Sequence, residues 1–230
     1  MNKKKSILVL AAHPDDEVLG CGGTIARLVK EGHSVSVAIM GEGITSRYSE
    51  RSSADPMQKI NLKNHSEKAS AILGVSDLRF FDMPDNRFDT VPLLDIVKII
   101  EQLIEEIQPD TVFTQHSGDL NVDHGIVFRA TITATRPLPE STVKEVLAYE
   151  VPSSTDWAFQ TGSKTFSPNV FFDISTTLDV KLLAMETYAS EIRMPPHPRS
   201  LDAIRENACR WGHIIGVRAA EAFESIREIR

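Results

Sequence analysis

Residues 6–13 read SILVLAAH, a continuous apolar run of strand length that ends in a histidine. A strand with one face in water alternates apolar and polar residues, whereas a strand buried on both faces is apolar throughout. Such burial requires a layer of helices on each side of the sheet. This run therefore predicts an α/β fold with a central sheet covered on both faces.

The segments that follow alternate between helical and strand patterns. Residues 24–33 place apolar side chains at helical spacing, Gly32 ends that helix, and residues 34–40 read as a second strand. Further strands are expected at 111–115, 143–151 and 169–174, and helices at 64–73, 91–107 and 123–135. This order predicts a doubly wound, mostly parallel sheet. Residues 41–61 are expected to form a long loop, and the tail, including 218–229, is expected to be helical.

Length and composition narrow the class of protein. With 230 residues, ordinary apolar content and no linker, the chain is expected to form one domain, 1–230. The net charge of −7 argues against a nucleic-acid partner, and no apolar run is long enough for a membrane span. A small-molecule substrate fits better, and a homo-oligomer is left open. Cys21 and Cys209 match no disulfide or metal pattern, so a cytoplasmic location is expected.

Two clusters of histidines and acids follow two of the expected strands. The first cluster contains His13, Asp15, Asp16 and Glu17, and the second contains His116, Asp119, Asp123 and His124. Parallel strands present their carboxyl ends at one edge of a sheet, so both clusters can face one crevice. The adjacent carboxylates repel one another, and a bound divalent cation would compensate their charge.

The residue types favour a zinc site. Two imidazoles and one carboxylate form a common catalytic zinc set, and the ligands chosen on chemical grounds are His13, Asp16 and His124. Pro14 stiffens the turn, so Asp15 is expected nearer the open coordination position. Alternatively, the acids only cap the next helix, which explains Glu17 but neither histidine. The small residues at 20–23 lack the spacing of a dinucleotide-binding turn and are expected to let that helix pack closely on the sheet.

The stretch AHPDDEVLGCGGTIARL, with HSGDLNVDH later in the chain, resembles the LmbE/PIG-L family of zinc-dependent N-acetylglucosaminyl deacetylases. The likeness covers nearly the whole chain and implies a Rossmann-like sheet. It also implies Zn²⁺ on His13, Asp16 and His124, with Asp15 as the general base. The activity implied is hydrolysis of an N-acetyl group from a GlcNAc-type amino sugar or its conjugate. Asp123 is expected behind the metal ligands.

Two departures from the family pattern alter the expected roles. Asn121 stands where many relatives carry a histidine, and an amide can donate to an oxyanion but cannot transfer a proton near neutral pH. The acid step then falls to Asp15, His116 or His197, the last in the proline-rich loop 194–200. Relatives also place an arginine on the helix after the second strand, which residues 61–74 lack. The substrate-binding candidates are therefore Arg47, Arg51, Arg87, His116 and Asp119.

Two other functions stay open at this point. The same fold and metal could hydrolyse a different N-acyl or ester substrate, since only the shape of the pocket would differ. A non-catalytic carbohydrate-binding or dinucleotide-binding relative is the alternative from another class, and it would lack the metal.

Overall fold

The computed structural model describes residues 4–159 and 165–230. One sheet of seven strands runs through the molecule in the order β3-β2-β1-β4-β5-β7-β6. The first five strands of that order are parallel, and β7 and β6 are antiparallel to their neighbours. The strands are β1 Ser6–Ala11, β2 Ser34–Gly41, β3 Asp77–Met83, β4 Thr111–Gln115, β5 Glu145–Tyr149, β6 Val170–Asp173 and β7 Ala220–Glu228.

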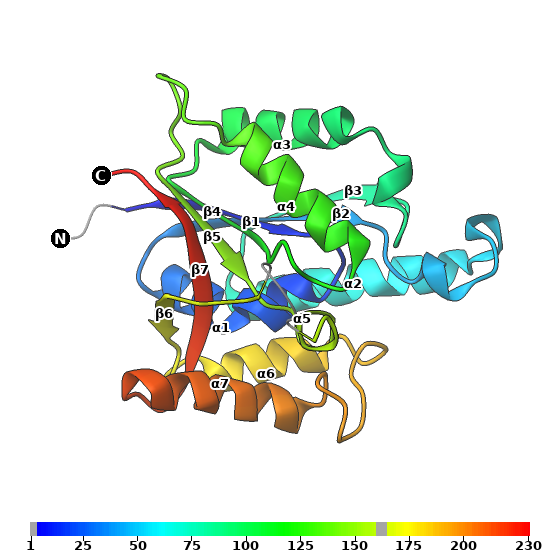
Figure 1. Ribbon diagram of the computed structural model, residues 1–230. Coiled ribbons are helices and arrows are strands. Elements are labelled where there is room, and N and C mark those ends of the chain that lie inside the picture. Colours follow the sequence, from blue (N-terminus) through cyan, green and yellow to red (C-terminus); the bar gives the residue numbers. More distant parts are fainter. Residues whose placement is uncertain (1–3, 160–164) are drawn as a thin grey trace.

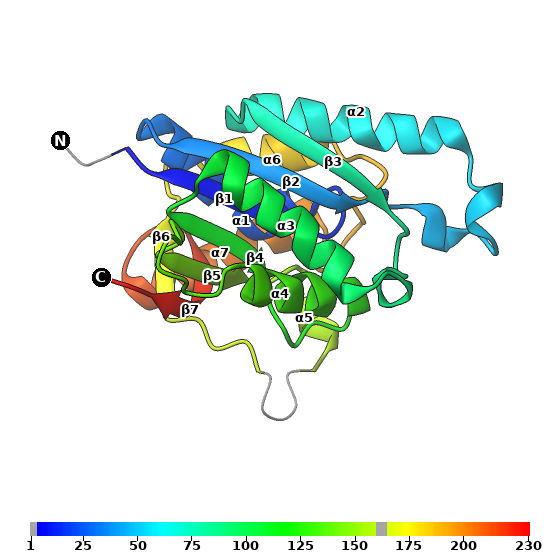
Figure 2. The ribbon, with the colours of Figure 1, turned by 90° about the horizontal axis from the view of Figure 1, so that it is seen from above.

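Helices cover both faces of the sheet. Figure 1 shows α3 and α4 on one face, with α1, α6 and α7 on the other. From above, α2 runs along the β3 edge of the sheet (Figure 2). The α-helices are α1 Asp16–Lys30, α2 Pro56–Leu73, α3 Leu93–Ile107, α4 Val122–Ala134, α5 Ser154–Trp157, α6 Leu178–Glu186 and α7 Leu201–Ile215. Three short 3₁₀ helices are η1 Thr45–Arg47, η2 Arg51–Ser53 and η3 Phe88–Thr90.

The first strand is buried on both faces, as its apolar run predicts. Ile7 and Val9 belong to the core beneath α1 and α6, whereas Leu8 and Leu10 belong to the core beneath α3 and α4. All four side chains are essentially inaccessible to solvent. The predicted α/β sandwich with a mostly parallel sheet is confirmed.

The glycine-rich start of α1 allows that helix to lie very close to the sheet. A Cβ atom added to Gly20 would lie 2.1 Å from Cδ2 of Tyr149, a distance that real contacts do not reach. Tyr149 is fully buried on β5, and its hydroxyl donates a hydrogen bond to the Leu10 carbonyl oxygen. The expectation of close helix packing is thus confirmed, and this packing fixes the position of α1 against the sheet at β5.

The strand order reverses between β1 and β4. From β1 the chain moves to β2 and β3 on one side, and from β4 it moves to β5 on the other. The two strands pair in register from Ile7 with Thr111 to Val9 with Phe113, so they end at about the same level. A crevice beyond the carboxyl ends of strands at such a switch point is where ligands bind in open α/β sheets.

Two local predictions were wrong. Residues 218–229 were expected to be helical, but Ala220–Glu228 is strand β7, which pairs with both β5 and β6. Its alanines and glutamates favour a helix locally, but pairing between two strands outweighs that preference. The helix expected from residue 64 begins at Pro56 instead, because Asp55 caps it by accepting a hydrogen bond from the Met57 backbone N–H.

Two further expectations concern cysteines and membranes. Cys21 and Cys209 are both free, and Cys21 is buried in the core. Within residues 4–159 and 165–230, no helix has the length and apolar character needed to cross a bilayer.

Candidate active site

His13 and Asp16 occupy the turn between β1 and α1. The backbone N–H of His13 donates to Asp16 Oδ2 at 2.9 Å, and His13 Nδ1 lies 3.5 Å from the same oxygen. The other ring nitrogen, Nε2, lies 2.9 Å from Asp123 Oδ2. Asp123 also accepts the backbone N–H groups of Asn86 and Phe88, so its carboxylate is held in place. It therefore lies behind His13, and Nδ1 is left to face Asp16.

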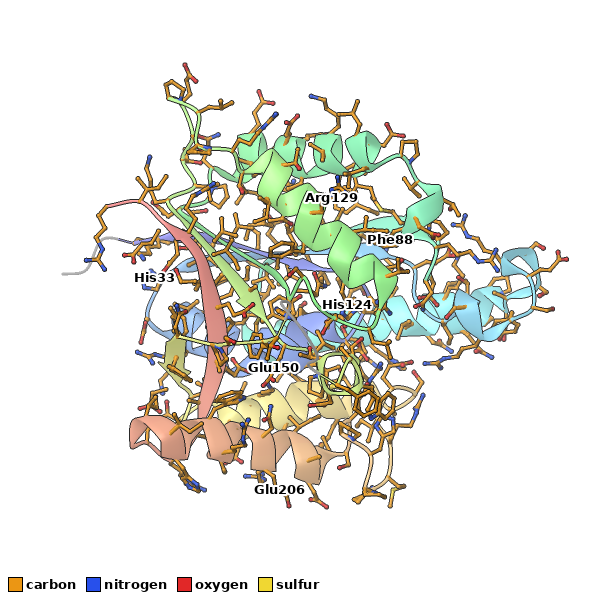
Figure 3. All side chains as sticks on the ribbon, in the orientation of Figure 1. His33, Phe88, His124, Arg129, Glu150 and Glu206 are labelled. Carbon is orange, nitrogen blue, oxygen red and sulfur yellow. The ribbon has the colours of Figure 1, made fainter. Side chains whose placement is uncertain are left out.

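His124 approaches Asp16 from the first turn of α4. Its Nε2 lies 3.3 Å from Asp16 Oδ2, and its Nδ1 lies 2.6 Å from Asp119 Oδ2. Figure 3 places His124 near the centre of the molecule, whereas His33, which directly precedes β2, lies at the opposite end of the strands. A carboxylate on the opposite ring nitrogen is the usual way in which proteins orient a metal-binding histidine.

Two ring nitrogens therefore converge on one carboxylate. One ligand atom from each of His13, Asp16 and His124 lies within 4.8 Å of the others, and all three residues are buried. A second group of this kind, His13 with Asp85 and Asp123, uses the other nitrogen of His13. The first group has the donor set typical of catalytic zinc, and each of its histidines is supported from behind. These residues fit a divalent metal ion.

The residues around His13, Asp16 and His124 carry an excess of negative charge. Burial alone would lower the pKa of His124, but Asp16 and Asp119 outweigh it and raise the pKa to about 9. Burial opposes ionisation of Asp16 as well, yet His124 and His13 hold its pKa well below the usual range. Both pKa shifts have the same cause, which is that the carboxylates favour positive charge at this position. A bound dication would supply that charge.

Asp15 lies between His13 and Asp16 in the sequence, and its backbone conformation is strained. It is the N-cap of α1 with φ 110°, and its side chain makes no capping hydrogen bond. Burial raises the pKa of Asp15 well above its usual value, and Arg199 opposes that rise. Ile44, Asn86 and Ser153 near the same site also have positive φ. Residues with strained backbone conformations cluster at functional sites. The alternative that Asp15 only caps the helix is not supported, because its side chain makes no capping hydrogen bond.

A polar cavity of about 190 Å³ opens beside these residues. His13, Asp15 and Asp16 of the first sequence cluster line it, together with His124 of the second. Arg47 and Asn121 also line it, from η1 and from the residue before α4. Asn121 Oδ1 accepts the Asp123 backbone N–H, and its Nδ2 donates to Asn86 Oδ1. Both side chains are thus placed to meet a ligand in this cavity.

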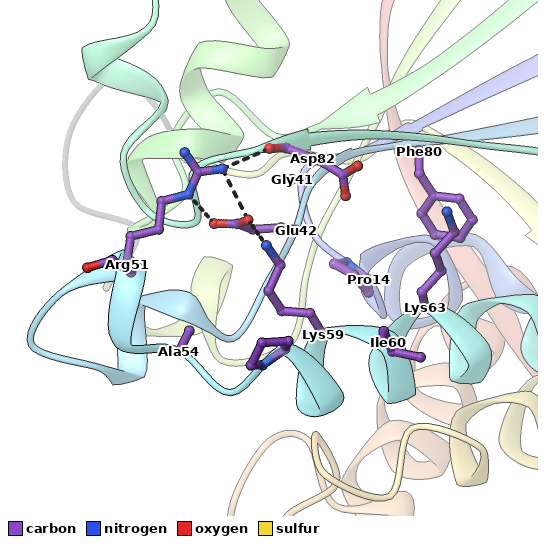
Figure 4. A pocket seen from close by; sticks show the side chains of 12 residues that line it. Pro14, Gly41, Glu42, Arg51, Ala54, Lys59, Ile60, Lys63, Phe80 and Asp82 are labelled. Carbon is purple, nitrogen blue, oxygen red and sulfur yellow. Dashed lines mark hydrogen bonds and ion pairs between the residues drawn. The ribbon is translucent and has the colours of Figure 1, made fainter.

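A larger cavity of about 570 Å³ lies across Pro14 from the first, and Arg51 belongs to it. Figure 4 shows Arg51 and Lys59 both bound to Glu42. Burial opposes ionisation of Glu42, but these two hydrogen-bonded cations lower its pKa to about 2. Arg51 therefore forms a local ion pair with Glu42. Neither Arg51 nor Arg87 is among the described residues that line the polar cavity.

Three other predicted residues point elsewhere. His116 is buried with Nδ1 2.7 Å from Glu224 Oε2, toward β7. Asp119 has a fully buried side chain that binds His124, so it contacts this histidine and not the cavity. His197 packs its ring against Trp157, and its Nδ1 accepts the Arg199 backbone N–H. Its proline-rich loop presents Arg199 to the cavity instead.

Two acidic residues of the cavity escaped the sequence reasoning, which also gave Arg199, in the proline-rich loop, no role. Asp85, Glu191 and Arg199 all line the cavity. Asp85 follows β3, so the rule that placed His13 after β1 could also have found it. Glu191 and Arg199 come from the segment between α6 and α7, where no strand end marks them.

The parallel sheet and the buried His/Asp/His group at its switch point define an α/β protein with a site suited to a catalytic divalent metal. The chain belongs to the PIG-L family. The family model, described as GlcNAc-PI de-N-acetylase, matches residues 8–135, which include every residue of the His/Asp/His group.

Known proteins similar to this chain are deacetylases by name or share its fold. The uncharacterized deacetylase YaiS of Escherichia coli is 31% identical over 82% of this chain and 93% of its own. The diacetylchitobiose deacetylase of Thermococcus kodakarensis is 26% identical over 98% of this chain and 84% of its own. The crystal structure of the conserved protein TT1542 from Thermus thermophilus superimposes with a TM-score of 0.77 at 26% identity, covering 98% and 96% of the two chains.

Proposed function

We propose that this protein is a zinc-dependent deacetylase that hydrolyses the N-acetyl group of a GlcNAc-type amino sugar or its conjugate. The observation that carries the proposal is the convergence of His13 Nδ1 and His124 Nε2 on Asp16 at the wall of a polar cavity. The family description and the name of the Thermococcus relative, both of which refer to N-acetylated amino sugars, support the substrate class.

His13, Asp16 and His124 would hold the zinc. When bound, zinc supplies a Lewis acid for the acetamide carbonyl and makes water a stronger nucleophile at neutral pH. Asp15 lines the cavity beside these ligands and is the proposed general base. It accepts a proton from the attacking water and returns it to the departing amine, so one carboxylate serves both steps.

Two further residues of the cavity are assigned to the substrate. Asn121 uses its Oδ1 to cap α4, so its Nδ2 is the group that donates a hydrogen bond to the developing oxyanion. Arg47 reaches the cavity from η1 and is bound there to Glu191. Its remaining guanidinium N–H groups are the proposed donors to sugar hydroxyls.

The test is acetate release by the zinc-loaded protein. We expect acetate from N-acetylglucosamine or N,N′-diacetylchitobiose, and none from an N-acetylamino acid or an acetyl ester. Asp15→Asn should keep its zinc yet lose turnover by roughly 10²–10⁴-fold, the usual share of general acid–base catalysis. Faster release from the amino acid or the ester would favour the alternative hydrolase. A metal-free protein that still releases acetate would overturn the proposal.

A further inference from the structure

Arg199 reaches into the polar cavity from the loop that precedes α7. Its Nη1 lies 3.1 Å from Asp15 Oδ2, and its Nε donates to Ser153 Oγ at 3.0 Å. Its backbone is fixed too, since its N–H donates to His197 Nδ1. The next residue, Ser200, caps α7 by accepting the Ala203 N–H. The guanidinium is thus anchored on both sides in a fixed position.

Asp15 needs such an anchor. Asp15 is the N-cap of α1 with φ 110°, yet its carboxylate makes no capping hydrogen bond to that helix. Its backbone N–H is bound separately, to Glu17 Oε2 at 3.1 Å. Within residues 4–159 and 165–230, Arg199 supplies the side-chain hydrogen bond to this buried carboxylate.

Two of the three guanidinium nitrogens of Arg199 bind protein side chains. Nε is bound to Ser153 and Nη1 to Asp15, while Glu191 Oε2 lies 3.8 Å from Nη1. Glu191 is itself bound to Arg47 on the other side of the cavity. The guanidinium is therefore held by the protein on the side that faces Asp15, and a charge-assisted hydrogen bond of this kind orients the carboxylate that accepts it.

We propose that Arg199 is a positioning residue that holds Asp15 in the orientation needed for proton transfer. The inference rests on the proposed function, because it assigns Asp15 the role of general base. By binding Oδ2, the guanidinium leaves Oδ1 as the oxygen that accepts the proton of the attacking water. Without it the carboxylate can rotate, and a misplacement of about 1 Å costs on the order of 100-fold in rate.

A double-mutant cycle tests this role. Arg199→Gln should lower kcat roughly 100-fold and leave KM within about threefold. In the Asp15→Asn background the same change should have almost no effect on kcat, because the group it positions is gone. Arg199→Lys should recover only part of the loss, since an ammonium cannot bind Ser153 and Asp15 as a fork. Arg193→Gln, on the same loop and exposed, is the matched control and should behave as wild type.

Three results would overturn the inference. A raised KM at unchanged kcat would make Arg199 a substrate ligand, and equal losses of kcat in the presence and absence of Asp15 would show that Arg199 does not act through Asp15. The third is a crystal structure of Arg199→Gln in which the Asp15 carboxylate keeps its orientation. That structure tests the positioning role independently of activity. If the wild-type protein released no acetate, only the proposed function would be refuted.

Discussion

At the scale of single residues, the site depends on carboxylates that stand behind the histidines. Asp119 Oδ2 lies 2.6 Å from His124 Nδ1, which fixes the proton on that nitrogen and leaves Nε2 free for a metal. Replacing Asp119 with asparagine removes the charge that makes the imidazole a strong ligand. We expect Asp119→Asn to weaken zinc affinity by roughly 10–100-fold, measured by competition with a chromophoric chelator.

A matched control separates this effect from a general loss of negative charge. Asp95 is exposed in the first turn of α3, so Asp95→Asn changes the net charge equally and should leave zinc affinity unchanged. Equal affinity in Asp119→Asn and wild type would show that the aspartate does not support the ligand.

At the scale of elements, the contact between α1 and β5 positions the start of α1. Gly20→Ala would push a methyl group into the buried Tyr149 ring, so we expect a loss of roughly 1–3 kcal/mol in the free energy of unfolding. Urea unfolding at constant zinc measures it. Gly125 in α4 is the control, because the nearest atom to an added Cβ is 3.7 Å away. Gly125→Ala should be neutral or slightly stabilising, and an equal loss in both variants would contradict close packing at Gly20.

At the scale of the whole molecule, the group of His13, Asp16 and His124 joins the segment after β1 to the segment after β4. A ligand that binds only the folded chain stabilises it, so zinc at about 100 times its Kd should add about 2.7 kcal/mol and raise Tm by roughly 5–10 °C. Differential scanning calorimetry with zinc and with a chelator measures the shift. His33→Ala should keep the shift, since His33 is remote from the group, whereas His124→Ala should lose it. A full shift in His124→Ala would place the zinc elsewhere.

Much of this site could be predicted because its residues follow strands. The apolar run at 6–11 and the strand pattern at 111–115 indicate two strands, and the carboxyl ends of parallel strands share an edge of the sheet. His13, Asp16 and His124 therefore come together by a rule that needs no coordinates. Strand β7 escaped the same reasoning, because its local sequence favours a helix and only pairing with β5 and β6 makes it a strand.

The sequence by itself determined the parallel part of the sheet, its covering helices and the group of histidines and acids at its switch point, because periodicity and chain order encode these directly. Only the tertiary structure decided which contacts the remaining polar residues make. His197 and Arg199 are two positions apart, yet one packs against Trp157 and the other binds Asp15. The physical reason is that a side chain in a loop takes its direction from distant segments packed around it, and no local pattern records that packing.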